Sequence, residues 1–161
     1  MTTKVLLPPR PPLSRLAAAW LGSVLAMGLI ALAAQESGQS LILGSFGASC
    51  VLVFGFPELP FSQPRHVLLG HLLSSAVGLV FLHGLGPGPL SLAAATATAI
   101  ALMMAARCVH PPAGSNPVIV FLLQPGFSFL LAPTLLGCLL LLLTALIFNN
   151  LGKGRRYPQY W

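Results

Sequence analysis

The sequence predicts an all-α membrane protein with six transmembrane segments, arranged as two inverted repeats of three segments each (residues 16–83 and 84–150). Hydrophobic residues make up 56% of the 161 residues and charged residues only 6%, whereas a soluble domain carries about a quarter charged residues. Apolar segments recur between short polar linkers, and the two halves align at a fixed spacing. Composition therefore excludes a soluble domain. The net charge of +6 comes from basic residues at the ends of spans, which predicts membrane orientation rather than nucleic-acid binding.

Four apolar segments have the length of ordinary membrane spans. A helix that crosses the hydrocarbon layer needs about 20 apolar residues. The four segments are residues 16–34, 66–82, 90–106 and 129–148. The third of these is rich in Ala and Thr, so we expect it to pack inside a bundle, where small side chains allow close helix contacts.

Two further apolar segments are broken by glycine or proline. Residues 41–56 contain three glycines, and residues 109–124 contain the run HPPAGSNP at residues 110–117. Adjacent prolines do not fit a regular helix, because each lacks an N–H and clashes with the preceding turn. Irregular backbone at membrane depth is tolerated only where protein or a water-filled cavity satisfies its polar groups. The run at 110–117 is therefore the first candidate for a functional site.

The basic residues favour six crossings over four or five. Five crossings would place the two basic termini on opposite sides of the membrane, against the positive-inside rule. With six crossings, all eight Lys and Arg residues face the cytoplasm, together with the tails 1–15 and 151–161. The linkers that then face outside contain no Lys or Arg, and they are residues 35–40, 83–89 and 125–128. We expect an uncleaved first span and a location in the bacterial inner (plasma) membrane.

The two halves of the chain resemble each other. A shift of 67 residues, the separation of Gly47 from Gly114, also lays the Leu-Leu-Gly triplet that ends at Gly70 on the triplet that ends at Gly137. An odd number of spans in each repeat makes the second copy enter the membrane from the opposite face. Inverted repeats of this kind occur in many transporters, whose substrate sites lie near the midplane where discontinuous helices meet.

In the second repeat, the broken segment predicts a short helix that starts near the midplane. Asn116 is a favourable N-cap, and Pro117 suits the first helical position, where its missing N–H leaves no bond unmade. The pair predicts a half-helix from Asn116 to about Gln124, preceded by extended chain over residues 110–115.

The matching segment of the first repeat predicts a second half-helix. Residues 41–48 would be extended, and Ser49 would cap a helix that ends near Phe56. Helix N-termini offer free N–H groups and the positive end of the helix dipole, so two opposed N-termini favour an anion. The predicted substrate ligands are backbone N–H groups and polar side chains of seven residues: Ser45, Gly47, Ala48, Ser49, Gly114, Ser115 and Asn116. The alternative is that these small residues only allow close helix packing.

Ionisable residues within apolar segments are candidates for function. His71 and His110 are each expected either to relay a proton that accompanies an anion or to hydrogen-bond a backbone carbonyl. Arg107 is expected at the cytoplasmic interface, where it would orient the chain or draw anions into a vestibule. Glu58 is expected to pair with Arg65.

The sequence contains no pattern that predicts catalysis or metal binding. HExxH and GxSxG motifs are absent, and the chain has only two acidic residues. Its three cysteines lie in or beside apolar segments without the spacing of metal ligands, so we expect them to pack in the core. We therefore predict no enzyme activity, no catalytic residue, no metal and no cofactor.

Two sequence blocks resemble the HPP family of integral membrane proteins. Residues 110–120, HPPAGSNPVIV, are similar to the family signature. Residues 44–49, GSFGAS, followed by QPR at 63–65 and GH at 70–71, are similar to its other shared block. The resemblance extends over about residues 41–148.

The resemblance implies anion transport, because plastid and cyanobacterial members of the family are associated with nitrite transport. Where the family pattern often has Asn after the QPR triplet, this chain has His66. We predict a transporter or channel for a small inorganic anion, with nitrite as the first candidate. The alternatives are transport of another small solute or of a weak acid with a proton, and a membrane enzyme or sensor subunit. A slim bundle with broken helices also predicts a homo-oligomer, with a dimer favoured.

Overall fold

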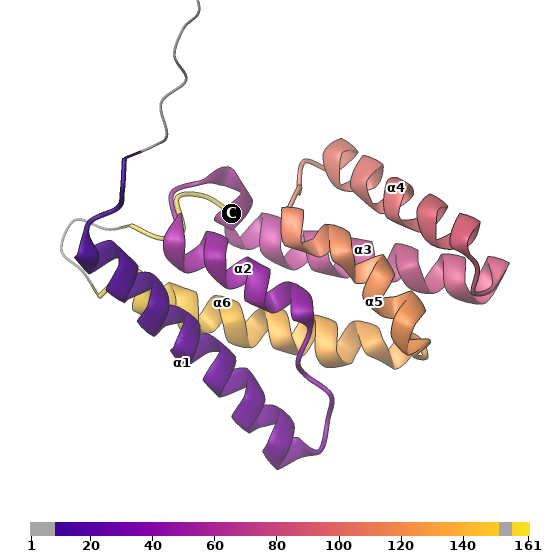
Figure 1. Cartoon of the computed structure of the whole chain (residues 1–161), viewed down its shortest axis with the longest axis horizontal. Coiled ribbons are helices and arrows are strands. Elements are labelled where there is room, and N and C mark those ends of the chain that lie inside the picture. Colours follow the sequence, from indigo (N-terminus) through magenta and orange to yellow (C-terminus); the bar gives the residue numbers. More distant parts are fainter. Residues whose placement is uncertain (1–8, 152–155) are drawn as a thin grey trace, which may run out of the picture.

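The computed structural model describes residues 9–151 and 156–161, which form helices and no strand. This confirms the predicted all-α class. Figure 1 shows the six α-helices: α1 (Leu13–Ser37), α2 (Gly44–Gly55), α3 (Pro64–Leu85), α4 (Pro89–Ala105), α5 (Asn116–Leu123) and α6 (Leu136–Phe148). Short 3₁₀ turns connect them at η1 (Pro60–Ser62), η2 (Pro111–Ser115) and η3 (Phe127–Leu130), and a π turn, η4 (Leu131–Leu135), leads into α6.

Three helices are long and apolar enough to cross a membrane: Leu13–Ser37, Pro64–Leu85 and Phe127–Phe148, the last being α6 with the turns before it. Three shorter apolar helices accompany them: Gly44–Gly55, Pro89–Ala105 and Pro111–Leu123, the last joining η2 to α5. At 1.5 Å per residue the 12 residues of α2 extend about 18 Å, little more than half of the hydrocarbon thickness.

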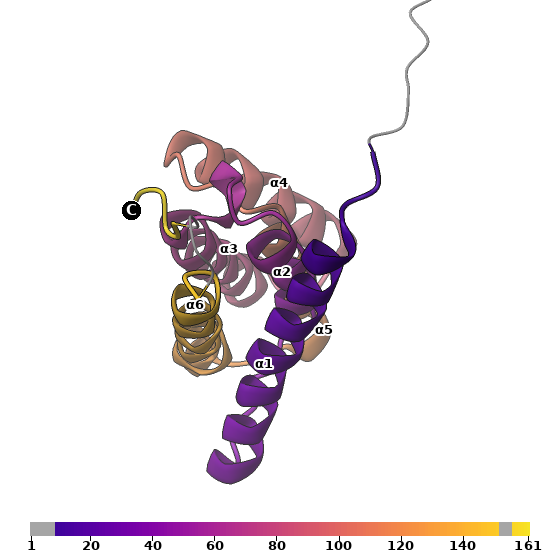
Figure 2. The same cartoon turned by 90° about the vertical axis from the view of Figure 1, so that its left-hand side faces the viewer.

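Helix α3 lies at the centre of the bundle. It packs against α4 and α5, while α1 packs against α2 and α6. Successive helices alternate in direction, so that α1, α3 and α5 run away from the end that holds the chain termini and α2, α4 and α6 run back toward it (Figures 1 and 2). The largest fully buried apolar side chains include Phe46, Ile30, Leu79 and Leu141, which come from four different helices and form one core.

Both termini of the described chain lie at one end of the bundle. Arg15, at the start of α1, forms an ion pair with Glu58 in the α2–α3 connection. The Tyr157 hydroxyl donates to the carbonyl of Ser62 in the same connection, at 2.7 Å. The predicted pairing of Glu58 with Arg65 is wrong, because the Arg65 side chain instead donates to carbonyls at the end of α4. Lys4, Lys153 and Arg155, which the topology prediction also used, lie outside the described residues.

The opposite end carries three of the five connections between the α-helices, α1–α2, α3–α4 and α5–α6. Helix α1 ends at Gly38, whose φ of 65° is the left-handed conformation that glycine adopts without strain. The His83 ring donates to the carbonyl of Pro125 at 2.9 Å, which holds the end of α3 beside the α5–η3 connection. The predicted linkers 83–89 and 125–128 thus contact each other, while linker 35–40 lies at the end of α1.

The predicted start of the first half-helix is wrong. Helix α2 begins at Gly44 and not at Ser49, so most of the stretch predicted to be extended is helical. Glycine weakens a helix by only about 1 kcal/mol. Burial of one helix face, including Phe46 and Cys50, outweighs that local preference here.

Helix α5 begins at Asn116, the residue that the sequence predicts as a helix start, but the chain before it is helical and not extended. Residues 111–115 form a 3₁₀ turn instead of extended chain and lead directly into α5. Pro111 and Pro112 occupy the first positions of that turn, where a missing N–H leaves no bond unmade. The Asn116 side chain does not cap the helix, because it points into the bundle and bonds to α3.

Candidate functional site

A buried cluster of polar side chains joins α2, α3 and the start of η2. The Ser49 hydroxyl lies 3.0 Å from Nε2 of His71 and 2.8 Å from Nε2 of His110. All three side chains are fully buried. The two histidines, which lie 22 and 61 positions after Ser49 in the sequence, therefore meet at its hydroxyl oxygen.

The hydrogen-bond partners determine which ring nitrogens carry hydrogen. Nδ1 of His110 lies 2.7 Å from the carbonyl oxygen of Phe61, which can only accept, so Nδ1 is the donor. In a neutral His110 ring, Nε2 then accepts the single Ser49 hydroxyl hydrogen at 2.8 Å, in competition with the Ser45 carbonyl at 3.0 Å. The Ser49 oxygen in turn accepts from Nε2 of His71, which leaves Nδ1 of His71 as an acceptor for the Asn116 amide at 3.0 Å. These bonds form a continuous chain with one consistent direction.

The chain of hydrogen bonds continues toward the other end of the bundle. The Asn116 amide also donates to Ser75 at 2.9 Å, and Thr134 in η4 donates to the same Ser75 oxygen at 3.1 Å. All three side chains are fully buried. Polar groups thus follow α3 from His71 through one helical turn to Ser75, bridged by α5 and η4.

No acidic side chain contributes to this cluster. The two acids of the chain are Glu36 and Glu58, which lie on the surface near the ends of the bundle. Imidazole, hydroxyl and amide groups carry either no charge or a positive one. The cluster therefore carries no negative charge, and its groups can both donate and accept hydrogen bonds. Phe46, edge-on to His71 with ring centroids 5.2 Å apart, makes one side of the cluster apolar.

Four of the predicted site residues meet in this cluster: Ser49, His71, His110 and Asn116. Ser45 lies one turn before Ser49 on α2, and its hydroxyl is the one buried side-chain polar atom without a partner among residues 9–151 and 156–161. Three other predicted ligands, Gly47, Ala48 and Ser115, are exposed on the surface of the bundle, and Gly114 is half-buried. The backbone N–H of Ser49 lies inside α2 and not at its free N-terminus, because the helix starts five residues earlier.

Arg107 lies on the surface at the end that holds the termini. It follows α4 and has a φ of 53°, which is uncommon for a residue with a side chain. Its carbonyl and that of Ala106 are the partners of the Arg65 side chain. The structure therefore separates Arg107 from the buried cluster.

Sequence reasoning missed Ser74, Ser75 and Thr134. Ser74 donates to the carbonyl of Ala113 at 2.7 Å, which fixes η2 against α3. A signal was present for Ser75, because residues four apart share a face of a helix and Ser75 stands four positions after His71. Thr134 gave no such signal, since it reaches Ser75 across 59 positions of sequence.

No group of three or more metal-ligating side chains occurs in the described part of the chain. The three cysteines, Cys50, Cys108 and Cys138, are buried and form no disulfide. They pack in the apolar core, as predicted.

Comparison with known proteins identifies the family. The model of the HPP family, described as its transmembrane region, matches residues 8–158. The chain belongs to the HPP family. Two transmembrane proteins of Dictyostelium discoideum are similar to it: one is 36% identical over 166 residues, covering 96% of this chain and 58% of its own length, and the other is 35% identical, covering 96% and 53%. The chain thus spans little more than half the length of these curated relatives. No solved structure gives a significant match.

In this HPP protein, the His-Pro-Pro run has two separate structural roles. His110 is the residue before η2, has extended backbone and turns its ring into the polar cluster. The two prolines that follow start the 3₁₀ turn. The run thus ends the connection from α4 and begins the helical segment Pro111–Leu123 at the point where His110 meets Ser49.

Proposed function

We propose that this HPP protein transports a small inorganic anion together with a proton, and that nitrite is the first candidate. The observation that carries the proposal is the fully buried Ser49–His71–His110 cluster, which contains two proton-accepting rings and no acid. Ionisable residues inside a membrane bundle are energetically costly, so they indicate function more often than a role in stability. An anion that arrives with a proton adds no net charge to the apolar interior.

The substrate would exchange its hydration shell for the donors of this cluster. The Ser45 hydroxyl has no partner among the described residues and supplies a donor one helical turn from Ser49. The Asn116 amide and the two imidazole rings would supply the others by exchanging their present acceptors within the protein for the substrate. A buried donor without a partner is rare in proteins and calls for a ligand or water.

The proton would move along the hydrogen-bonded chain of His71, Ser49 and His110. It would enter at Nδ1 of His71 once the Asn116 amide turns away from that nitrogen, and would leave from Nδ1 of His110 to a water molecule that takes the place of the Phe61 carbonyl. Each neutral imidazole has one protonated and one free nitrogen, so a proton that enters at one nitrogen releases another from the opposite side of the ring. The Ser49 hydroxyl connects the two rings at 2.8 and 3.0 Å. Before a second proton can pass, the two imidazole rings and the Ser49 hydroxyl must return to their original hydrogen-bond directions.

An inverted repeat fits this function. Gly44 and Pro111, which start the two central helical segments, are separated by the same 67 residues as Gly47 and Gly114. Alternation of helix direction makes α2 and α5 antiparallel. Opposed central segments allow a site to open first to one face and then to the other. We further propose that the basic end faces the cytoplasm and that the protein assembles as a homo-oligomer, with a dimer favoured.

Nitrite uptake into proteoliposomes tests the proposal. We expect uptake to rise when the outside is made more acidic than the inside, and proton entry to accompany it. His71→Asn and His110→Asn should lower both fluxes at least tenfold. Uptake of formate in the same vesicles examines the second candidate, another weak acid moved with a proton. If neither nitrite nor formate nor chloride crosses the membrane faster than in empty vesicles, the proposal is wrong.

A further inference from the structure

Two cavities meet at Arg15, at the end of the bundle that holds the termini. The first, which we call the headgroup pocket, has a volume of about 310 Å³ and is lined by polar and charged side chains that include Arg15, Glu58, Asn149, Arg156 and Gln159. The second, which we call the acyl groove, has a volume of about 550 Å³ and runs between α1 and α2. Its walls are almost entirely apolar, and they include Leu16, Trp20, Met27, Val51 and Phe56.

We propose that these two cavities together bind one anionic phospholipid, with its phosphate in the headgroup pocket and an acyl chain in the acyl groove. The polar headgroup pocket adjoins the apolar acyl groove, just as the polar headgroup of a phospholipid adjoins its acyl chains. Arg15 lines both cavities, so nothing separates the two parts. The proposal is independent of what the protein transports.

The charge of the headgroup pocket matches a phosphate. Among the described residues that line it, Arg15 and Arg156 contribute two positive charges and Glu58 one negative charge, an excess of one positive charge. Arg15 is held at the junction, because its Nε donates to the carbonyl of Gly55 at 3.0 Å and its guanidinium lies 5.2 Å from the centre of the Phe56 ring. A guanidinium is well suited to phosphate oxygens, which it can bind in pairs. Arg156 would bind the phosphate in this way, and Arg15 would share its terminal N–H groups between the phosphate and its ion-pair partner Glu58.

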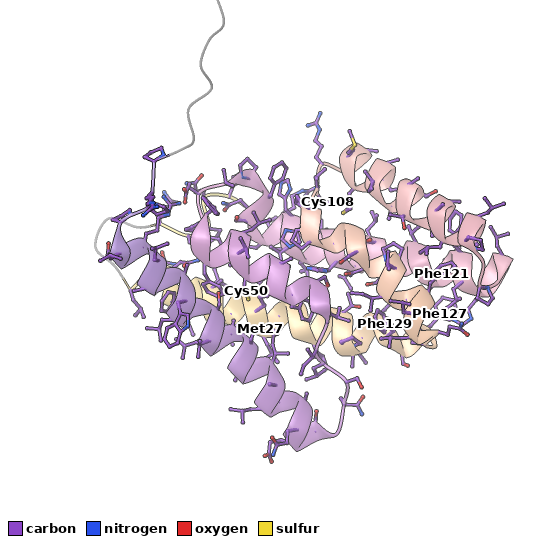
Figure 3. The ribbon with its side chains drawn as sticks, in the orientation of Figure 1. Met27, Cys50, Cys108, Phe121, Phe127 and Phe129 are labelled. Atoms are coloured by element: carbon purple, nitrogen blue, oxygen red, sulfur yellow. The ribbon has the colours of Figure 1, made fainter. Side chains whose placement is uncertain are left out.

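The length of the acyl groove matches one leaflet of a bilayer. On α1 the groove extends from Arg15 to Met27, about 18 Å at 1.5 Å per residue. Half of the hydrocarbon thickness is about 15 Å. Figure 3 shows Met27 on α1 and Cys50 on α2, both of which line the groove at its far end from Arg15.

The charges of the chain also favour a lipid over a second copy of the protein. A second copy in the same membrane orientation would have to offer an acidic side chain to the headgroup pocket. Glu58 already lines that pocket, and Glu36 lies near the other end of α1. No other acidic residue exists in the chain. Trp20, which is 69% exposed beside the groove, is a residue type enriched where membrane proteins meet lipid headgroups.

Thermal unfolding of the detergent-purified full chain tests the proposal. We expect added phosphatidylglycerol to raise the unfolding midpoint by several degrees more than phosphatidylcholine with the same acyl chains. Glycerol phosphate, which has the same phosphate and no acyl chain, should leave the midpoint unchanged. Equal shifts with the two lipids, or a shift with glycerol phosphate as large as with phosphatidylglycerol, would overturn the proposal.

Two variants test the two cavities separately. Arg156→Gln should remove at least half of the difference between the lipids, whereas Arg107→Gln, a basic residue at the same end outside both cavities, should leave it intact. Gly55→Leu should fill the acyl groove and weaken the response to phosphatidylglycerol. Gly84→Leu is the matched control, because a Cβ at either glycine meets no atom within 4 Å and Gly84 lies outside the groove. If Gly55→Leu instead separates an oligomer into monomers and keeps the full lipid response, the groove is a protein interface and the proposal is wrong.

Discussion

Gly70 and Gly137 occupy equivalent packing positions in the two halves of the chain. A Cβ on Gly70 would lie 3.1 Å from the carbonyl oxygen of Cys108, and a Cβ on Gly137 would lie 3.1 Å from that of Leu41. The two glycines are 67 residues apart, and so are Leu41 and Cys108. The third helix of each half therefore approaches the backbone that leads into the central segment of the other half, at a distance that a side chain would prevent.

Replacement of either glycine should destabilise the bundle. In Gly70→Ala the new methyl group would also lie 2.8 Å from Cβ of His110, and in Gly137→Ala it would collide with the Phe46 ring. Overpacking of this kind destabilises by about 1–3 kcal/mol. Unfolding in detergent should show a loss in this range for both variants.

A third glycine provides the control. Gly84 lies in α3 with open space around it, so Gly84→Ala should leave stability unchanged or raise it by up to about 1 kcal/mol. Equal stability of all three variants would contradict the close approach at Gly70 and Gly137. Loss at only one of those two positions would contradict the equivalence of the two halves.

Ser49→Ala should uncouple the two histidines. The variant removes the one atom that bonds both rings and leaves a nitrogen of each without its partner. We expect nitrite-driven proton entry in proteoliposomes to fall at least tenfold. Stability should fall by about 1–3 kcal/mol, the usual effect of leaving buried polar groups unsatisfied.

Thr96→Ala is the matched control for Ser49→Ala. Its hydroxyl donates to the carbonyl of Leu92 in the preceding turn at 2.9 Å, as the Ser49 hydroxyl can to that of Ser45. Removal of the Thr96 hydroxyl therefore deletes one hydrogen bond within a helix and affects neither histidine ring. Full proton entry in Ser49→Ala, or an equal loss in Thr96→Ala, would exclude Ser49 as the connection.

The class of the fold and four members of the buried cluster could be predicted from sequence, but not the geometry that unites them. Apolar composition dictates membrane helices, and ionisable groups such as His71 and His110 stand out in such a chain. The start of α2 could not be read locally, because glycine at 44 and 47 resembles a break until the buried face of the helix is known. The role of Asn116 was predicted from its cap preference, whereas its side chain follows the tertiary partner, Ser75.

The C-terminal segment should be fixed by Tyr157, and this contact should weaken at high pH. Burial raises the pKa of the Tyr157 phenol, and its hydroxyl donates to the carbonyl of Ser62 at 2.7 Å. Because the pKa is higher in the folded than in the unfolded state, the contribution is complete below pH of about 10 and is lost as the pH rises through the folded value. Tyr157→Phe should lower stability by about 1 kcal/mol at neutral pH and remove this alkaline component.

Tyr160→Phe is the control that separates the loss of stability due to Tyr157 from any other loss of stability at high pH. The Tyr160 side chain is 43% exposed, and its hydroxyl lies 3.4 Å from Nε2 of His66. Its removal should leave stability and the alkaline decline nearly unchanged. The same pH profile in wild type and Tyr157→Phe would contradict the assignment to Tyr157.

The two ends of the bundle should face opposite sides of the membrane, with the basic end inside. Gln39 follows α1 at the end whose connections carry no Lys or Arg, while Gln159 lies beside Gln63 at the end that holds the described basic residues from Arg15 onward. Positive-inside bias then predicts that Gln39 faces outward. In a background without the three native cysteines, Gln39→Cys should react with an impermeant maleimide in intact cells. Gln159→Cys should react only after permeabilisation. Exchange of the two results would reverse the orientation, and labelling of both from outside would contradict the separation of Gln39 and Gln159 to opposite ends.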